Sequence, residues 1–343
     1  MDTLFVKACG IVSCVGFNAA SSLAALRAGI RNIKESYLWN PIMGENINVG
    51  KVSLPHWWID FEKLPDLVAP AIYECLAAAH PIPANEIPVL IGVASPDRPF
   101  RWEHLDERIL EEIEYRLNVK FHHASQVIAR GRVSGIAGIE KTGVLFERYG
   151  LKYCIIAGVD SLLQQNLAEF YLNSRRILTS QNSNGFSLGE AGAACLIGRT
   201  GKPNQDELHF LSTSITREKA TIESEKPLRA DGLTQAYREV LTRADLEIYD
   251  VDYRITDLNG EHYKFKEAAL ADLRFQRKPK EKLYDLWHPN EFLGDIGAAI
   301  GPCVFGVAMH ASQKGYAIGP TALIHFGNDN GERAAAIVRH NPR

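Results

Sequence analysis

The sequence has no surplus of charge that would draw it to a polyanion. Its 38 lysines and arginines nearly balance 41 aspartates and glutamates, the formal net charge is −3, and no long basic run occurs. Proteins that bind nucleic acid or an anionic membrane surface need such a surplus to neutralise phosphates. The composition therefore excludes nucleic acid as a main partner.

Long apolar runs and paired cysteines are missing as well. No stretch approaches the roughly 18 consecutive apolar residues of a membrane-spanning helix, and the apolar start at 4–16 lacks the preceding basic segment of a secretion signal. The six cysteines form no C-x-x-C pair and no zinc-spaced cluster with histidine. These absences predict a cytoplasmic protein with reduced thiols, no membrane span and no metal site.

The common catalytic and nucleotide-binding motifs do not occur. The chain has no phosphate-binding G-x-x-x-x-G-K-[ST] loop, no dinucleotide-binding G-x-G-x-x-G loop and no H-E-x-x-H. The hydrolase elbow G-x-S-x-G is also absent, since Ser134 lies in GRVSG, which is G-x-x-S-G. The sequence therefore predicts no cofactor.

What the sequence does contain is an alternation of strand and helix patterns. Short β-branched runs bounded by glycine or asparagine predict buried strands at 4–13, 89–95, 153–161, 192–200, 254–260, 321–331 and 333–340. Apolar residues at helical spacing predict helices at 18–30, from an N-cap at Asn18, at 134–150, stopping at Gly150, and within 284–314. Strands that alternate with helices indicate an α/β protein with covered sheets.

A weak internal repeat predicts that the chain consists of two related halves. IIAGVDS (155–161) precedes EAGAACLIGR (190–199) in the first half, and LIHFGNDNG (323–331) precedes ERAAAIVR (332–339) in the second. Polar stretches around residue 203 place the boundary there, giving domains 1–203 and 204–343. The charged segment 274–283 is interpreted as a surface excursion.

Five segments, in register over nearly the whole chain, resemble the ketosynthase branch of the thiolase superfamily. They are VKACGIVSCVGFNAASSLAALRAG (6–29), EKTGVLFERYGLKYCIIAGVDSLL (140–163), SNGFSLGEAGAACLIGR (183–199), GDIGAAIGP (294–302) and IHFGNDNGERAAAIVR (324–339). The resemblance implies a five-layered α/β/α/β/α fold built from two related halves. It also implies a dimer formed across a strand of the first half.

The resemblance implies further that the family's catalytic cysteine is lost. That cysteine lies at a strand-to-helix elbow ahead of a Ser-Gly pair, which Ser134 and Gly135 match here. Arg132 then stands at the cysteine position, or Val133 does if the small length difference falls elsewhere in the helix. Neither side chain can hold an acyl group covalently.

The other positions of the family's site have changed too. Asn259 and Asp295 stand where the family has its two histidines, or histidine and asparagine, and the neighbouring lysine has no counterpart. Asn328 replaces a phenylalanine whose backbone N–H contributes to the family's oxyanion site. Asn259 cannot shuttle a proton as imidazole does. Asp295 and Arg132 carry opposite charges at one expected site, so we expect Asp295 to pair with Arg132 and neutralise it.

These losses favour a protein without condensing activity, although the residues leave more than one function open. The first is a degenerate partner or scaffold subunit in acyl-chain metabolism, analogous to a chain length factor and present as a homodimer or as a mixed dimer with a ketosynthase-like subunit. The second is an atypical acyltransferase or thioester hydrolase that uses Asn259, Asp295 and a hydroxyl such as that of Ser134. In this function Asp295 is the base, because burial raises its pKa. The third is a binding module for an acyl carrier protein, for which 274–282 offers a basic rim.

Overall fold

Two five-stranded layers of sheet dominate the structure, a computed structural model that describes residues 3–55, 60–200, 207–276 and 285–340. The first layer contains β1 (Thr3–Val12), β4 (Val89–Gly92), β5 (Gln126–Ile128), β6 (Tyr153–Ser161) and β7 (Leu188–Thr200). The second contains β8 (Leu208–Arg217), β9 (Tyr253–Thr256), β10 (Leu286–Trp287), β11 (Thr321–Gly327) and β12 (Glu332–His340).

The two layers have the same topology. Their strand orders are β1-β7-β6-β4-β5 and β8-β12-β11-β9-β10, and β1 pairs with β8 where the layers meet. In each order the first three strands pair antiparallel with one another, and the fourth and fifth strands are added parallel to the third. This duplication confirms the prediction of two related halves. The proposed boundary at residue 203 lies outside the described residues.

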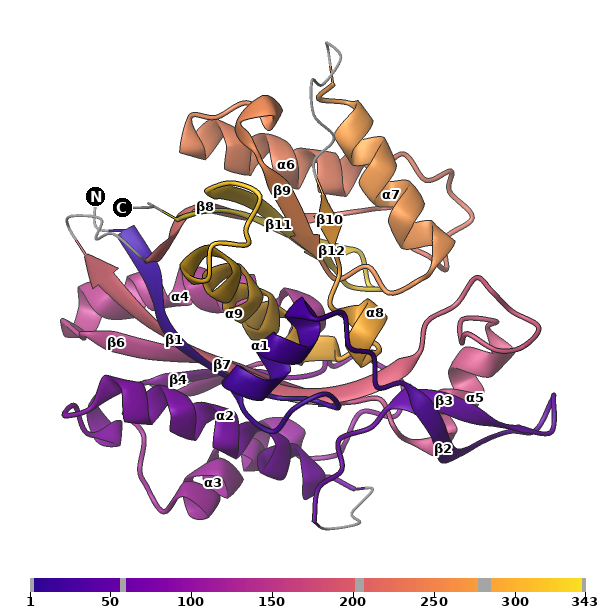
Figure 1. The fold of residues 1–343 in the computed structure, drawn as a ribbon, viewed down its shortest axis with the longest axis horizontal. Helices are drawn as coiled ribbons and strands as arrows, with labels where there is room; N and C mark the ends of the chain where they lie inside the picture. Colours follow the sequence, from indigo (N-terminus) through magenta and orange to yellow (C-terminus); the bar gives the residue numbers. More distant parts are fainter. Residues whose placement is uncertain (1–2, 56–59, 201–206, 277–284, 341–343) are drawn as a thin grey trace.

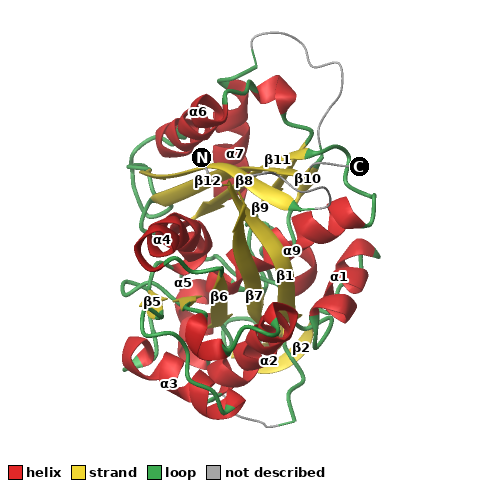
Figure 2. Cartoon of the chain, turned by 90° about the vertical axis from the view of Figure 1, so that its left-hand side faces the viewer, coloured by secondary structure: helices red, strands yellow, loops and turns green. Residues whose placement is uncertain are grey.

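Helices separate and cover the sheets, so that five layers stack from top to bottom in Figures 1 and 2. The middle layer holds α4 (Ser134–Tyr149) and α9 (Ile300–Gln313); the outer layers hold α2 (Lys63–Ala79) and α3 (Leu105–Leu117) on one side and α6 (Asp231–Ala244) and α7 (His262–Leu273) on the other. The predicted α/β class and five-layered fold are confirmed.

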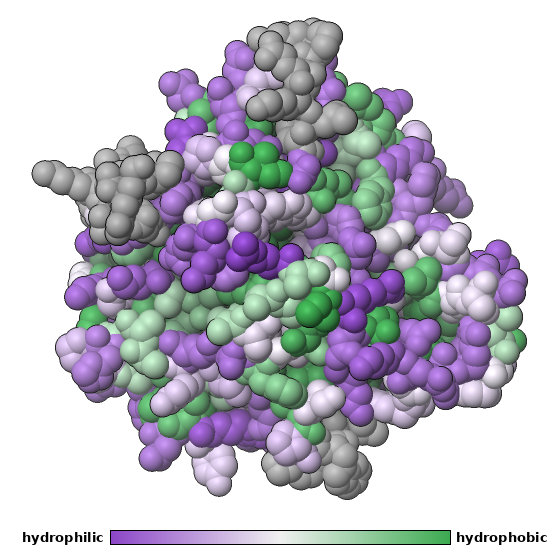
Figure 3. Space-filling view, in the orientation of Figure 1, coloured by the Kyte–Doolittle hydropathy of each residue, from purple (hydrophilic) through white to green (hydrophobic). Residues whose placement is uncertain are grey.

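The remaining elements lie at the margins of these layers. They are α1 (Ala19–Arg27), the hairpin β2 (Lys34–Asn40) and β3 (Glu45–Gly50), α5 (Gln165–Asn173) and the short α8 (Asn290–Leu293). Figure 3 shows apolar side chains gathered near the centre of one face, over α1, with hydrophilic ones over much of the rim. No helix in the described ranges is long and apolar enough to cross a membrane.

Glycines allow the two central helices to touch. A Cβ on Gly135 of α4 would lie 2.9 Å from the Cα of Gly301 on α9, closer than real Cβ atoms come to other atoms. Each helix follows a 3-10 turn that begins with a glycine at φ 53°, Gly131 before α4 and Gly297 before α9. Only glycine adopts this left-handed conformation readily. The two turns therefore bring the N-termini of α4 and α9 together at the centre of the molecule.

Candidate functional site

The turn before α4 places Arg132 in the wall of a cavity and Val133 in the core. Val133 is completely buried in the apolar cluster between the sheets, whereas the Arg132 side chain lines the cavity. Of the two residues that the sequence left as alternatives, Arg132 is the one that faces the cavity.

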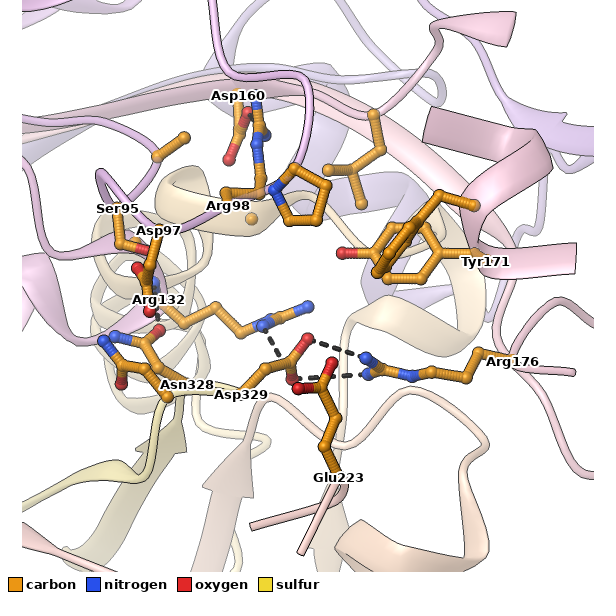
Figure 4. Close-up of a pocket in the computed structure, with 17 residues that line it drawn as sticks. Ser95, Asp97, Arg98, Arg132, Asp160, Tyr171, Arg176, Glu223, Asn328 and Asp329 are labelled. Atoms are coloured by element: carbon orange, nitrogen blue, oxygen red, sulfur yellow. Dashed lines mark hydrogen bonds and ion pairs between the residues drawn. The ribbon is translucent and has the colours of Figure 1, made fainter. Parts of the chain in front are cut away.

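The cavity has a volume of about 430 Å³ and lies where the two halves meet. Its walls come from the loop after β4, the start of α4, α5 and the turn between β11 and β12 (Figure 4). The charged residues that line it are Asp97, Arg98, Arg132, Asp160, Arg176, Glu223 and Asp329.

Arg132 is held by Asp295 in a buried, two-point ion pair. Arg132 Nη2 lies 2.6 Å from Asp295 Oδ2, and Nε lies 3.3 Å from Oδ1. The side chain of Asp295 is 0% exposed and that of Arg132 is 10% exposed. The expected pairing of these two residues is confirmed, and it joins the start of α4 to the segment that precedes α9.

Further hydrogen bonds fix Asp295 in its charged form. Asn259 Nδ2 donates to Oδ2 at 2.9 Å, and the backbone N–H of Gly297 donates to Oδ1 at 3.0 Å. Burial alone would raise the pKa of Asp295, but the charges of Arg132 and Lys264 and the hydrogen bonds from Arg132 and Asn259 lower it to about 2. The expectation of a burial-raised pKa at Asp295 is therefore wrong, because the carboxylate is fully paired, and a general-base role loses its premise.

A second ion-pair network borders the first. Arg176 Nε binds Glu261 Oε1 at 2.7 Å, and Arg176 Nη1 binds Asp329 Oδ2 at 2.8 Å. Asp329 Oδ1 also lies 3.7 Å from Arg132 Nη1, so Asp329 stands between the two arginines (Figure 4). Their charges keep the pKa of Asp329 far below its ordinary value against the opposing effect of burial.

Asn328 caps the turn that carries Arg132. Its Oδ1 accepts the backbone N–H of Arg132 at 3.0 Å, its Nδ2 donates to the carbonyl of Arg130 at 2.7 Å, and its own N–H donates to the carbonyl of Glu332 at 2.9 Å. Both backbone N–H groups that could have bound an oxyanion are thus already engaged within the chain.

Ser134 lies behind the cavity rather than in it. The residue is 1% exposed, and its Oγ donates to the carbonyl of Gly131 at 2.6 Å. A Cβ on Gly92 of β4 would come within 2.1 Å of the same Oγ, which shows how tightly the hydroxyl is packed against the sheet. This position gives the Ser134 hydroxyl no path to a ligand in the cavity.

No cysteine reaches the cavity either. All six thiols, at Cys9, Cys14, Cys75, Cys154, Cys195 and Cys303, are buried, and none belongs to the cavity wall. At Cys303, the one nearest Asp295 in sequence, burial and the neighbouring Cys9 raise the pKa to about 12. A buried thiol of this kind is a poor nucleophile because the thiolate is disfavoured.

Several residues of the site could not be found from the sequence. Arg98, Tyr171 and Arg176 come from loops and α5, and no sequence motif marks them. Asp329 lies in the segment 324–339 that resembles the family, but its ion pair with Arg176 joins residues far apart in the sequence. Lys264 of α7 is likewise buried, 2.8 Å from Asp257, and its charge acts on Asp295. Within the described ranges, no group of acids, histidines or cysteines is arranged to hold a metal ion.

The basic segment expected to form a rim is only partly described. Residues 277–282 of 274–282 lie outside the described residues. Arg274 is bound to Asp231 at 2.9 Å.

Comparison with known proteins identifies the fold. No family model and no curated protein matches the sequence. Solved structures match over nearly the whole length. The ishigamide ketosynthase/chain length factor is 17% identical, with 98% of this chain and 99% of that chain covered at a TM-score of 0.69. A type II polyketide synthase acyl carrier protein in complex with its ketosynthase bound to the hexaketide (AntDE:AntF) gives 11% identity, coverage of 99% of each chain and a TM-score of 0.80.

A third structure is similar to the same extent. The ketosynthase (ApeO) in complex with its chain length factor (ApeC) from Xenorhabdus doucetiae is 13% identical, with 99% of this chain and 98% of that chain covered at a TM-score of 0.73. The chain therefore has the thiolase-like fold of ketosynthases and chain length factors, as the five sequence segments predicted.

Proposed function

We propose that this chain, which has the fold of ketosynthases and chain length factors, is a non-condensing partner subunit in polyketide- or fatty-acid-type synthesis. It assembles with a ketosynthase-like subunit or with a second copy of itself. In this role it shapes the assembly and the site of its partner rather than carrying an acyl chain itself.

One observation carries the proposal, namely that Arg132 faces the cavity at the start of α4 and is committed to Asp295. A condensing enzyme of this fold needs a nucleophile at that place and a backbone N–H to bind the oxyanion. Here the side chain is a guanidinium that cannot be acylated, and the backbone N–H of Arg132 is bound to Asn328. The position at the start of α4 therefore offers neither a nucleophilic side chain nor a free backbone N–H.

The edge of the first sheet supports an assembly of two subunits. β5 ends the strand order of that layer and, within the described ranges, pairs only with β4. An unpaired strand edge readily accepts another strand. A partner's strand placed against β5 would extend the sheet across the dimer, which is the arrangement that the family resemblance implies.

A groove beside the cavity supports an acidic carrier as a second partner. Arg175 and Lys266 border this groove of about 520 Å³, which shares Arg176 and Glu223 with the cavity wall. Arg175 and Lys266 are exposed. Positive side chains at an entrance steer an acidic partner toward it.

Native mass spectrometry tests the assembly. We expect the chain to form a dimer, alone or with a co-expressed ketosynthase-type subunit, and Val127→Glu on β5 to weaken it at least tenfold. Ile318→Glu, at a residue 52% exposed in the second half, is the matched control and should leave the dimer intact. Melting curves show whether Val127→Glu still folds. A chain that remains monomeric under both conditions would contradict the proposed partner role.

A further inference from the structure

A second pocket, the aromatic pocket, lies between α1, α8 and α9. It has a volume of about 370 Å³ and shares no lining residue with the charged cavity described above. Its wall includes the rings of Trp287, Phe292 and Tyr316, with Leu26 of α1 and Val307 of α9 beside them. The volume lies within the range of roughly 300–1,000 Å³ that is typical of small-molecule sites, and such sites are mostly apolar and aromatic.

Two aromatic rings of the wall are held in fixed orientations. The rings of Trp287 and Tyr316 stack with their centroids 6.1 Å apart and their planes 26° apart. Behind them, the Tyr253 ring lies 4.8 Å from that of Trp287, and the Tyr316 hydroxyl is hydrogen-bonded to His310 Nδ1 at 2.8 Å. Ring-on-ring contacts add attraction beyond the burial of apolar surface. The wall therefore favours a ligand that is itself aromatic.

Arg27 places a positive charge at the mouth of the aromatic pocket. This residue, the last of α1, lines the pocket and is exposed. Its guanidinium lies 4.8 Å from the centroid of the Tyr316 ring, and the side chain forms no ion pair with any described residue. A guanidinium offers parallel N–H groups that bind a carboxylate at two points. Arg27 is therefore available to an anionic group that sits beside the Tyr316 ring.

The charges around Arg27 also favour an anion. Among the described residues that line the aromatic pocket, Glu291 is the one acid, and its Oε2 lies 3.5 Å from His288 Nδ1. Lys314, directly after α9, is exposed and close enough that its charge, together with burial and the charge of Arg27, lowers the pKa of His310. The balance of formal charge at this end of the pocket is therefore positive.

We propose that the aromatic pocket binds a small aromatic carboxylate, with its ring system against Trp287 and Tyr316 and its carboxylate at Arg27. The short separation of 4.8 Å between the Arg27 guanidinium and the Tyr316 ring lets one small ligand reach both groups. A neutral aromatic compound would leave the guanidinium without a partner, and an aliphatic carboxylate would lose the ring contacts. The site is separate from the cavity at Arg132.

Calorimetric titration of the full chain tests the proposal without any partner subunit, so its outcome is independent of the assembly test above. The probes are naphthalene-2-carboxylate and indole-3-acetate. Naphthalene-2-methanol, which lacks the charge, and octanoate, which lacks the ring, are the controls. We expect at least one aromatic carboxylate to bind with a Kd below about 1 mM and at least tenfold more tightly than either control.

A pair of arginine variants locates the binding. Arg27→Gln should weaken the better probe at least tenfold. Arg148→Gln is the matched control and should have no effect, because Arg148 is also an exposed arginine in the last turn of a helix, 5.2 Å from the Tyr149 ring, but lies outside the pocket wall. Melting curves show that both variants fold.

Three results would overturn the proposal. The first is that neither aromatic carboxylate binds with a Kd below about 1 mM. The second is that naphthalene-2-methanol or octanoate binds as tightly as the aromatic carboxylates. The third is that Arg27→Gln binds the better probe as tightly as the wild type does.

Discussion

Asn328 and Asp160 occupy equivalent places in the two halves of the molecule. Asn328 Oδ1 accepts the backbone N–H of Arg132 at 3.0 Å, and Asp160 Oδ2 accepts that of Ala298 at 3.4 Å. Each of these N–H groups follows a glycine at φ 53°, in the turn that starts a central helix. The capping contact at Arg132 is therefore part of the repeated architecture of the fold, and the arginine side chain is what distinguishes the first half.

The buried ion pair of Arg132 and Asp295 leads to a first prediction about stability. Asp295→Ala leaves an uncompensated guanidinium in the interior, so the free energy of unfolding should fall by about 3–5 kcal/mol. Urea denaturation measures the change. Glu239→Ala, which breaks the exposed pair with Arg243, is the control and should cost less than about 1 kcal/mol.

Removing both charges should be less harmful than removing one. Arg132→Met combined with Asp295→Leu takes away the ion pair together with the cost of burying it, so the double variant should be more stable than Asp295→Leu alone. Urea denaturation of these proteins and of Arg132→Met completes the comparison. A double variant that loses the sum of the two single losses would show that the two side chains do not interact.

The pKa of Asp295 predicts a pH dependence of stability. Its pKa falls from an ordinary value of 3.8 to about 2 in the folded chain. The pair therefore stabilises the fold at pH values above about 4, and this contribution of roughly 2 kcal/mol is lost as the pH falls toward 2. Between pH 5 and pH 2 the wild type should lose more stability than Asp295→Asn. Equal losses in the two proteins would contradict the paired, charged form of Asp295.

Two glycines on α4 should respond to alanine in opposite ways. A Cβ at Gly135 would lie 2.9 Å from the Cα of Gly301, whereas a Cβ at Gly143 meets nothing within 4 Å. Gly135→Ala should therefore push the central helices apart and destabilise the chain by about 1–3 kcal/mol. Gly143→Ala should stabilise it by roughly 0.4–1 kcal/mol. Thermal unfolding of the two variants provides the comparison, and a harmless Gly135→Ala would contradict the close contact of α4 with α9.

The elements that local patterns specify could be predicted from the sequence. The helix expected to stop at Gly150 does so, with that glycine at φ 65°, and Asn18 caps α1 by accepting the backbone N–H of Ser21 at 2.8 Å. The helical segment expected within 284–314 is present as α9, and β10 and α8 precede it. Gly294 and Gly297 adopt positive φ between α8 and α9, so the two helices are separate.

The candidate site was predictable only where the family resemblance marked its positions. Arg132 and Asp295 stood at two such positions, and opposite charges at neighbouring places predicted their contact. Arg98 and Tyr171 could not be found, because loop and helix residues reach the cavity only through the arrangement of both halves. The lowered pKa of Asp295 results from the charges of Arg132 and Lys264 and from the hydrogen bonds of Arg132 and Asn259, which only the folded chain brings together.

The absence of covalent acyl transfer is the central claim, and intact mass spectrometry tests it most directly. The chain is incubated with malonyl- and acyl-thioesters beside a cysteine-containing ketosynthase as positive control, and thiol release is followed in parallel. We predict that the mass of the chain stays unchanged and that thiol release stays at the rate of the buffer alone, while the control gains an acyl group. A covalent acyl adduct on the chain, or a turnover that Asp295→Ala abolishes, would contradict the account.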